Sequence, residues 1–127
     1  MVAIVAVVLK LNPDACALEG YRIACRGPLQ GGHIFHRGEV RGNAEARKIL
    51  VAQAAQFMET GHAELMAWQC AEHNVGRLAN SREAKRIQLL QKVYEYGWQH
   101  MTDFMEMFLS TFKVRPVEWE LERMLER

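Results

Sequence analysis

Cysteine and histidine side chains are concentrated in two short stretches of this chain. The stretch IACRGPLQGGHIFHR contains Cys25, His33 and His36, and the stretch QCAEHN contains Cys70 and His73. Thiolates and imidazoles are common metal ligands, and an imidazole, whose pKa is near neutral, can also act as a general base. These residue types therefore permit metal binding and proton transfer. A cysteine can equally fill an apolar core without binding anything.

Short strands are the elements expected to position these residues. Glycine and proline punctuation predicts one strand over residues 21–25 and a second over residues 33–36, paired as a hairpin. A short apolar run, residues 65–70, leads into Cys-Ala-Glu-His-Asn. The apolar run at residues 1–9 is rich in Val and Ile, and this composition predicts a buried strand. The run is too short to span a bilayer as a helix and lacks the features of a signal peptide.

Helices are expected in much of the remaining chain. Asn43 can cap a helix over residues 44–60 that stops at Gly61. A second helix is predicted to start at Asn80, because Glu83 three residues later completes a sequence that resembles a capping box. Helices and strands together predict the α+β class.

The C-terminal part of the chain is predicted to be helical. Gly97 ends or bends the preceding helix, residues 98–112 form an amphipathic stretch, and residues 117–125 form a short terminal helix. Residues 98–112 are rich in Met and Phe, which are expected to supply core packing or an oligomer surface. We therefore expect a homo-oligomer, if one forms, to use these helices.

Composition places the chain among soluble globular domains. It has 127 residues, of which 50% are apolar and 24% charged, and this excludes a disordered tail or a collagen-like fibre. Three cysteines, an odd number, do not form a secreted disulfide framework, so a cytoplasmic protein without a membrane segment is expected. The net charge of +1 hides a basic segment, residues 71–92, and an acidic tail, residues 93–127.

The order of these motifs resembles that of the HNH nucleases, the ββα-metal family, in its small phage-type form. That family has a cysteine knuckle, a strand that bears the catalytic histidine, a second knuckle and a last His or Asn on a helix. The stretches IACRGPLQGGHIFHR and QCAEHN match this order, and HNVGRLANSREAKRIQLLQKVYEYG is similar to the tail of phage-type members. The resemblance covers residues 16–100 and implies one HNH-like domain, with its core at about residues 16–95 and a helical extension at 98–127.

The resemblance implies a metal-dependent DNA endonuclease that leaves 3′-hydroxyl and 5′-phosphate ends. His33 would be the general base that deprotonates water, and Asn74 would be an oxygen ligand of a catalytic Mg²⁺ or Mn²⁺ ion. Arginines near the motifs would contact DNA phosphates. These are Arg37, Arg41, Arg77 and Arg82.

The chain departs from the family pattern at two positions, and the first of them binds the metal in the family. Gly32 stands where the family has Asp or His, and Leu65 stands where it has Asn. Asn43 would replace the second of these only if its loop folds back. In an alternative register, His33 is the metal ligand and His36 the base, but residues three apart on a regular strand point to opposite faces, so this register needs a bulge.

The resemblance also implies a structural zinc site of four ligands. Cys25, Cys70 and His73 supply three, while Arg22 stands at the position of the missing knuckle cysteine. Cys16 is the candidate for the fourth ligand. Two further functions stay open: an inactive, zinc-stabilised DNA- or protein-binding module on the same scaffold, and a helical oligomeric interaction protein.

Overall fold

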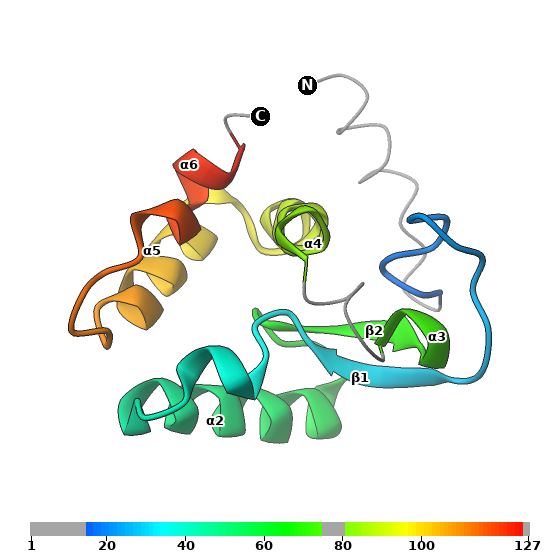
Figure 1. Cartoon of the computed structure of the whole chain (residues 1–127), viewed down its shortest axis with the longest axis horizontal. Helices are drawn as coiled ribbons and strands as arrows, with labels where there is room; N and C mark the ends of the chain where they lie inside the picture. Colours follow the sequence, from blue (N-terminus) through cyan, green and yellow to red (C-terminus); the bar gives the residue numbers. More distant parts are fainter. Residues whose placement is uncertain (1–14, 75–80, 126–127) are drawn as a thin grey trace.

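A two-stranded antiparallel sheet lies between helices in the computed structural model, which describes residues 15–74 and 81–125. Strand β1 (Leu29–His33) pairs with β2 (Met66–Cys70), with Leu29 opposite Cys70 and His33 opposite Met66. Helix α2 (Ala44–Thr60) lies along one face of the sheet, and α4 (Arg82–Tyr96) crosses the other (Figure 1). The chain is α+β, as predicted.

The predicted hairpin is wrong in its pairing. Residues 21–25 form no strand, because local turn bonds take up their backbone: Tyr21 N–H donates to Leu18 O, and Arg22 has a positive φ of 64°. The partner of β1 is instead β2, which follows after α2. The expected turn at Gly31-Gly32 lies inside β1.

Helix α2 has the predicted bounds because both of its ends are capped locally. The Asn43 side chain accepts a hydrogen bond from Ala46 N–H at 3.1 Å, which satisfies one of the free donors of the first turn. Gly61 adopts the left-handed conformation, with a φ of 78°, and its N–H donates to Phe57 O.

The N-cap of helix α4 lies one residue after the predicted cap. Its N-cap is Ser81, whose hydroxyl accepts from Ala84 N–H at 3.0 Å and bonds to the Tyr21 hydroxyl at 2.8 Å. The predicted cap, Asn80, lies outside the described residues. A serine hydroxyl serves as an N-cap as well as an asparagine amide.

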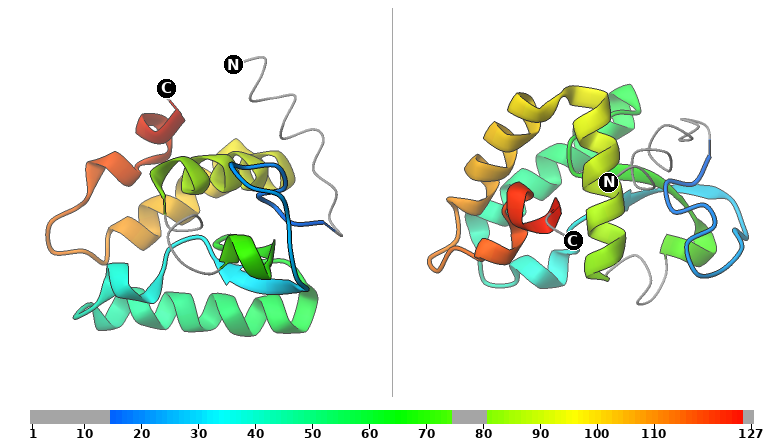
Figure 2. Two further views of the ribbon diagram at one scale, coloured as in Figure 1. Left: turned by 45° about the vertical axis from the view of Figure 1, so that its right-hand side comes forward. Right: turned by 90° about the horizontal axis from the view of Figure 1, so that it is seen from above.

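Gly97 separates α4 from α5 (Trp98–Leu109), which packs against α4 (Figure 2). Helix α5 ends at Leu109, three residues before the predicted end. The predicted terminal helix divides into a 3₁₀ turn, η2 (Val117–Trp119), and α6 (Leu121–Leu125). Two short elements complete the fold: the 3₁₀ turn η1 (Arg37–Val40) after β1 and α3 (Ala71–Asn74) after β2.

Most of the Met and Phe side chains of α5 are in the core. Met101, Met105 and Phe108 are fully buried, while Met107 is 43% exposed. Phe35, just after β1, lies 5.3 Å from the Phe108 ring, so the strand end and the C-terminal helices share one core. The expected oligomer through these helices stays a prediction.

The predicted strand at residues 1–9 lies outside the described residues. Within the described residues, no helix combines the length and apolar character needed to cross a membrane. The residues that could do chemistry lie around the sheet, where two separate groups form.

Candidate metal centre

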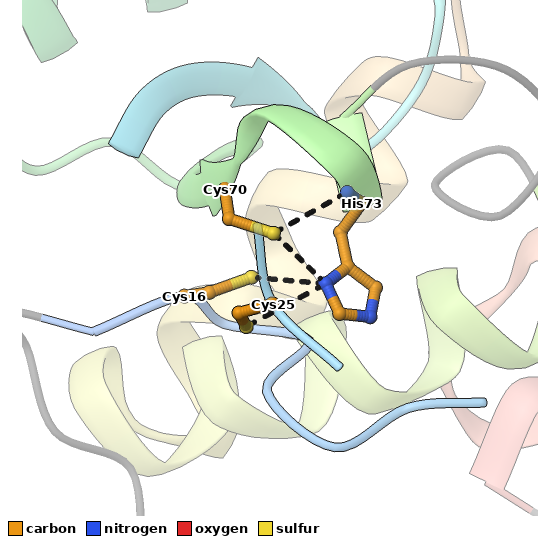
Figure 3. A group of neighbouring side chains, drawn as sticks. All are labelled: Cys16, Cys25, Cys70 and His73. Carbon is orange, nitrogen blue, oxygen red and sulfur yellow. Dashed lines mark hydrogen bonds between the residues drawn. The ribbon is translucent and has the colours of Figure 1, made fainter. Parts of the chain in front are cut away.

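Three thiols and one imidazole converge at the end of the sheet (Figure 3). The ligand atoms of Cys16, Cys25, Cys70 and His73 all lie within 4.8 Å of one another, a separation that one metal ion can bridge. The four residues come from the segment before β1, the end of β2 and α3. The structure therefore brings together all four residues of the predicted zinc site.

The Cys-x-x-His spacing places two of these groups on one side of the β2–α3 junction. Cys70 is the last residue of β2, and His73 lies within the single turn of α3. His73 N–H donates to Cys70 Sγ at 3.4 Å, and the same sulfur lies 3.0 Å from Nδ1 of the ring. Strand and turn together thus fix half of the site.

Long-range backbone bonds bring the other two thiols to this junction. Next to Cys16, Ala17 N–H donates to Trp68 O of β2 at 2.7 Å. At Arg26, the residue that follows Cys25, the carbonyl oxygen accepts a hydrogen bond from Glu72 N–H of α3 at 3.1 Å. Cys16 is buried and Cys25 is exposed, so one side of the site faces solvent.

The tautomer of the His73 ring follows from its hydrogen bonds. Nε2 lies 2.9 Å from the carbonyl oxygen of Tyr21, which can only accept, so Nε2 carries the proton. Nδ1 therefore has a free lone pair. It lies 3.7 Å from Sγ of Cys16 and 3.7 Å from Sγ of Cys25. This tautomer is the one needed for metal binding through Nδ1.

Three close thiols do not ionise together without a compensating positive charge. Burial raises the pKa of Cys16, and burial and the neighbouring thiols raise the pKa of Cys25 to about 12. Burial also acts against ionisation of Cys70, but hydrogen bonds from backbone N–H groups outweigh it and lower the pKa of Cys70 to about 6. A bound divalent cation would supply the charge that stabilises all three thiolates. The group could thus hold a metal ion.

A second group surrounds the predicted base, His33, at the end of β1. This half-buried side chain lines a cavity of about 210 Å³ together with residues of η1 and α2. The lining residues are His33, Arg37, Arg47, Leu50, Val51 and Ala54. Burial, and then the charge of Arg37, lower the pKa of His33 below its ordinary 6.5, so the ring is neutral at pH 7. Its Nδ1 is buried without a hydrogen-bond partner among the described residues.

The structure does not place His33 and Asn74 on one face of the sheet. A side chain at position 32 would point at Asn74, since a Cβ there would lie 2.8 Å from Asn74 Oδ1. His33 is the next residue in the strand and points the opposite way, toward α2. Asn74 donates instead to Gln30 Oε1 at 2.8 Å.

The alternative ligands also have other partners. Leu65 is fully buried, and the Asn43 side chain caps α2 and donates to Thr111 O at 3.3 Å, so it does not fold back to replace an Asn at position 65. His36 is the N-cap residue of η1, where burial lowers its pKa, and it does not line the His33 cavity. Among the described residues, no set of magnesium ligands forms beside His33, so the catalytic ion implied by the resemblance does not fit here.

The four predicted phosphate-binding arginines differ in position. Arg37 lines the His33 cavity, whereas Arg41 at the end of η1 and Arg82 at the start of α4 are exposed elsewhere. Arg77 lies outside the described residues. The sequence interpretation missed Arg47, an exposed residue of α2 that lines the same cavity, although its helical spacing groups it with residues 50, 51 and 54 on one side of the helix.

Comparison with known proteins found no relative of this chain. No family model matches it, and neither a curated protein nor a solved structure matches it. The chemistry of the two groups, the thiol cluster and the His33 cavity, is therefore argued from their own geometry.

Proposed function

We propose that Cys16, Cys25, Cys70 and His73 bind one zinc ion that stabilises the fold. Three cysteines and one histidine form a common structural zinc set, and the His73 tautomer leaves Nδ1 free to coordinate. The ion would join the segment before β1 to β2 and α3, which the described residues otherwise connect through hydrogen bonds and small apolar contacts.

Metal analysis of the purified full-length chain tests this proposal. We expect one zinc per chain, lost on dialysis against a strong chelator at low pH together with cooperative unfolding, because a site of this kind forms only in the folded chain. Protein expressed with added zinc that still contains none would contradict the proposal.

We further propose that the domain is an HNH-like DNA endonuclease in which His33 is the general base. One observation carries this proposal: a neutral imidazole lies in an open cavity whose other polar side chains are two arginines. A neutral imidazole can accept a proton from water, and guanidinium groups are suited to phosphate oxygens.

The hydrolysis uses His33 in one proton transfer. A water oxygen attacks phosphorus while its proton passes to the imidazole, and the bond between phosphorus and the 3′ oxygen breaks. The departing oxygen takes a proton from solvent, which leaves a 3′-hydroxyl and a 5′-phosphate. Arg37 would stabilise the negative charge that develops on the phosphate oxygens.

Nicking of supercoiled plasmid tests the nuclease proposal. We expect wild-type protein to nick DNA and His33→Ala to lose this activity while keeping its zinc and its circular dichroism spectrum. His62→Ala is the matched control, because His62 is exposed on the surface away from the cavity lining. The assay is run with Mg²⁺, with Mn²⁺ and without either. Equal nicking by wild type and His33→Ala would contradict the proposal.

A second candidate function is a zinc-stabilised module that binds DNA without cutting it. The observation that favours it is the separation of His33 from Asn74, together with the missing side chain at Gly32. For this function we expect salt-dependent retardation of DNA and no nicking under any metal condition. Cleavage that depends on His33 would exclude it.

A further inference from the structure

We propose that the cavity between the end of β1 and α2 binds a phosphate ester of a DNA strand, with Arg37 and Arg47 bonded to its oxygens. This inference deepens the proposed nuclease function, because it names the group that the cavity holds and adds Arg47 as a binding residue. It applies equally to the non-cleaving module, and binding can be measured without cleavage.

The turn η1 and the helix α2 each contribute one arginine to the lining of the cavity. Arg47 stands one helical turn before Leu50 and Val51 on α2, and all three line the cavity, Leu50 from the buried face of the helix and Arg47 and Val51 from its exposed flank. Arg37 begins η1, four residues after His33 at the end of β1. Two arginines from separate elements thus line a single cavity.

These two arginines have no counter-charge in the described part of the chain. Among the described residues, neither Arg37 nor Arg47 takes part in an ion pair, and the cavity lining contains no carboxylate. Nearby Glu45, a possible partner, pairs with Lys48 instead. Two like charges at one cavity repel each other, and an anion bound between them would remove this repulsion.

The size and floor of the cavity define the class of ligand. A volume of 210 Å³ is that of about seven water molecules in the liquid, which accommodates a phosphate and the sugar attached to it. Leu50, Val51 and Ala54 provide apolar contact for the carbon atoms of that sugar. Guanidinium forks can bond two phosphate oxygens at once, an arrangement that a chloride ion cannot provide.

The experiment measures binding of a short fluorescent DNA strand by anisotropy, with zinc-loaded full-length protein and no added magnesium or manganese. We expect Arg47→Ala to weaken binding by about tenfold or more, because a charge-assisted hydrogen bond is lost. Lys48→Ala is the matched control, since it removes the same charge from the next, exposed residue of α2. We expect this control to change the affinity by less than about twofold.

A second variant tests the cavity itself without changing charge. Ala54→Phe would fill the space between the arginines and the floor, and we expect it to weaken binding as Arg47→Ala does. Equal weakening by Arg47→Ala and Lys48→Ala would overturn the proposal, as would full binding by Ala54→Phe. Each variant is compared with wild type for zinc content and circular dichroism before binding is measured.

The choice of DNA strand identifies the source of the phosphate. Tighter binding of a 5′-phosphorylated strand than of its 5′-hydroxyl form, lost in Arg47→Ala, assigns the cavity to a terminal phosphate. Equal binding of both strands, with the same loss, assigns it to an internal phosphodiester. If the wild-type protein cleaves DNA but Arg47→Ala leaves its DNA affinity unchanged, only this inference is overturned. If Arg47→Ala weakens DNA binding but the wild-type protein does not cleave, only the nuclease proposal is overturned.

Discussion

The carbonyl oxygen of Tyr21 accepts a hydrogen bond from Nε2 of His73 across a distance of 2.9 Å. This one contact sets the ring tautomer and holds the other nitrogen toward the three thiols. It also ties the segment before β1 to α3, so the backbone of one segment orients a ligand of another. The candidate metal centre is therefore oriented by the fold around it.

Replacement of Cys70 by serine should remove the zinc and much of the stability. Cys70 is buried and its pKa of about 6 makes it the thiol most readily ionised at neutral pH, so the ion would lose the thiolate that is most available to bind it. We expect the free energy of unfolding to fall by about 4 kcal/mol or more, measured by urea denaturation beside zinc analysis. The control variant His62→Gln should keep the zinc and the stability of the wild type. A Cys70→Ser protein that still contains one zinc per chain would show that the Cys70 sulfur is not a ligand.

The pH dependence of cleavage should report the titration of His33. Burial and the charge of Arg37 lower its pKa below 6.5, and a base acts only when unprotonated, so activity should persist down to pH values below 6.5 and then fall. In Arg37→Ala the pKa rises, and the acid limb of the single-turnover rate at saturating DNA should move to higher pH. Lys48→Ala should leave the midpoint unchanged. A limb that moves to lower pH in Arg37→Ala would assign the titration to another group.

Gln53→Ala should destabilise the start of β2. Gln53 is buried, and its side-chain oxygen accepts from Leu65 N–H at 2.6 Å while its amide donates to Glu64 Oε1 at 3.0 Å. Loss of these bonds and the resulting cavity should cost about 2–4 kcal/mol in the free energy of unfolding. Gln99→Ala, at an exposed glutamine of α5, should cost less than about 0.5 kcal/mol. Equal effects would show that the buried bonds contribute little.

The same variant should show a pH signature through Glu64. Burial raises the pKa of this carboxyl, but hydrogen bonds from Gln53 and His100 outweigh burial and lower it below 4.5. A lowered carboxyl pKa stabilises the fold above the unfolded pKa, and this contribution is lost as pH falls through the folded value. The stability difference between wild type and Gln53→Ala should therefore shrink below about pH 4.5, which urea titrations at several pH values would measure.

Gly32→Ala should destabilise the sheet, whereas Gly38→Ala should not. A Cβ at position 32 would clash with Gln69 Oε1, and Gln69 is held by its bond to Gln88 Oε1 at 2.7 Å. Overpacking of this kind costs about 1–3 kcal/mol in the free energy of unfolding. A Cβ at Gly38 would meet open space. Thermal denaturation of the two variants makes the comparison, and equal melting temperatures would show that Gln69 can move aside.

Local sequence was sufficient for features whose contacts lie within a few residues. The bounds of α2 follow from the amide of Asn43 and the left-handed Gly61, and both were predictable because a cap bonds the adjacent turn. The Cys70-x-x-His73 pair is local in the same sense. These features depend on side-chain type and spacing alone.

Only the tertiary structure decided which distant segments meet. The pairing of β1 with β2, rather than with residues 21–25, depends on how α2 folds back between them, and no local pattern encodes that choice. The same pairing register turns Gly32 toward Asn74 and His33 toward α2, and so separates the two predicted catalytic residues and places His33 beside Arg47. The sequence by itself determined which groups could bind metal or phosphate, and strand alternation and long-range packing determined which of them share a site.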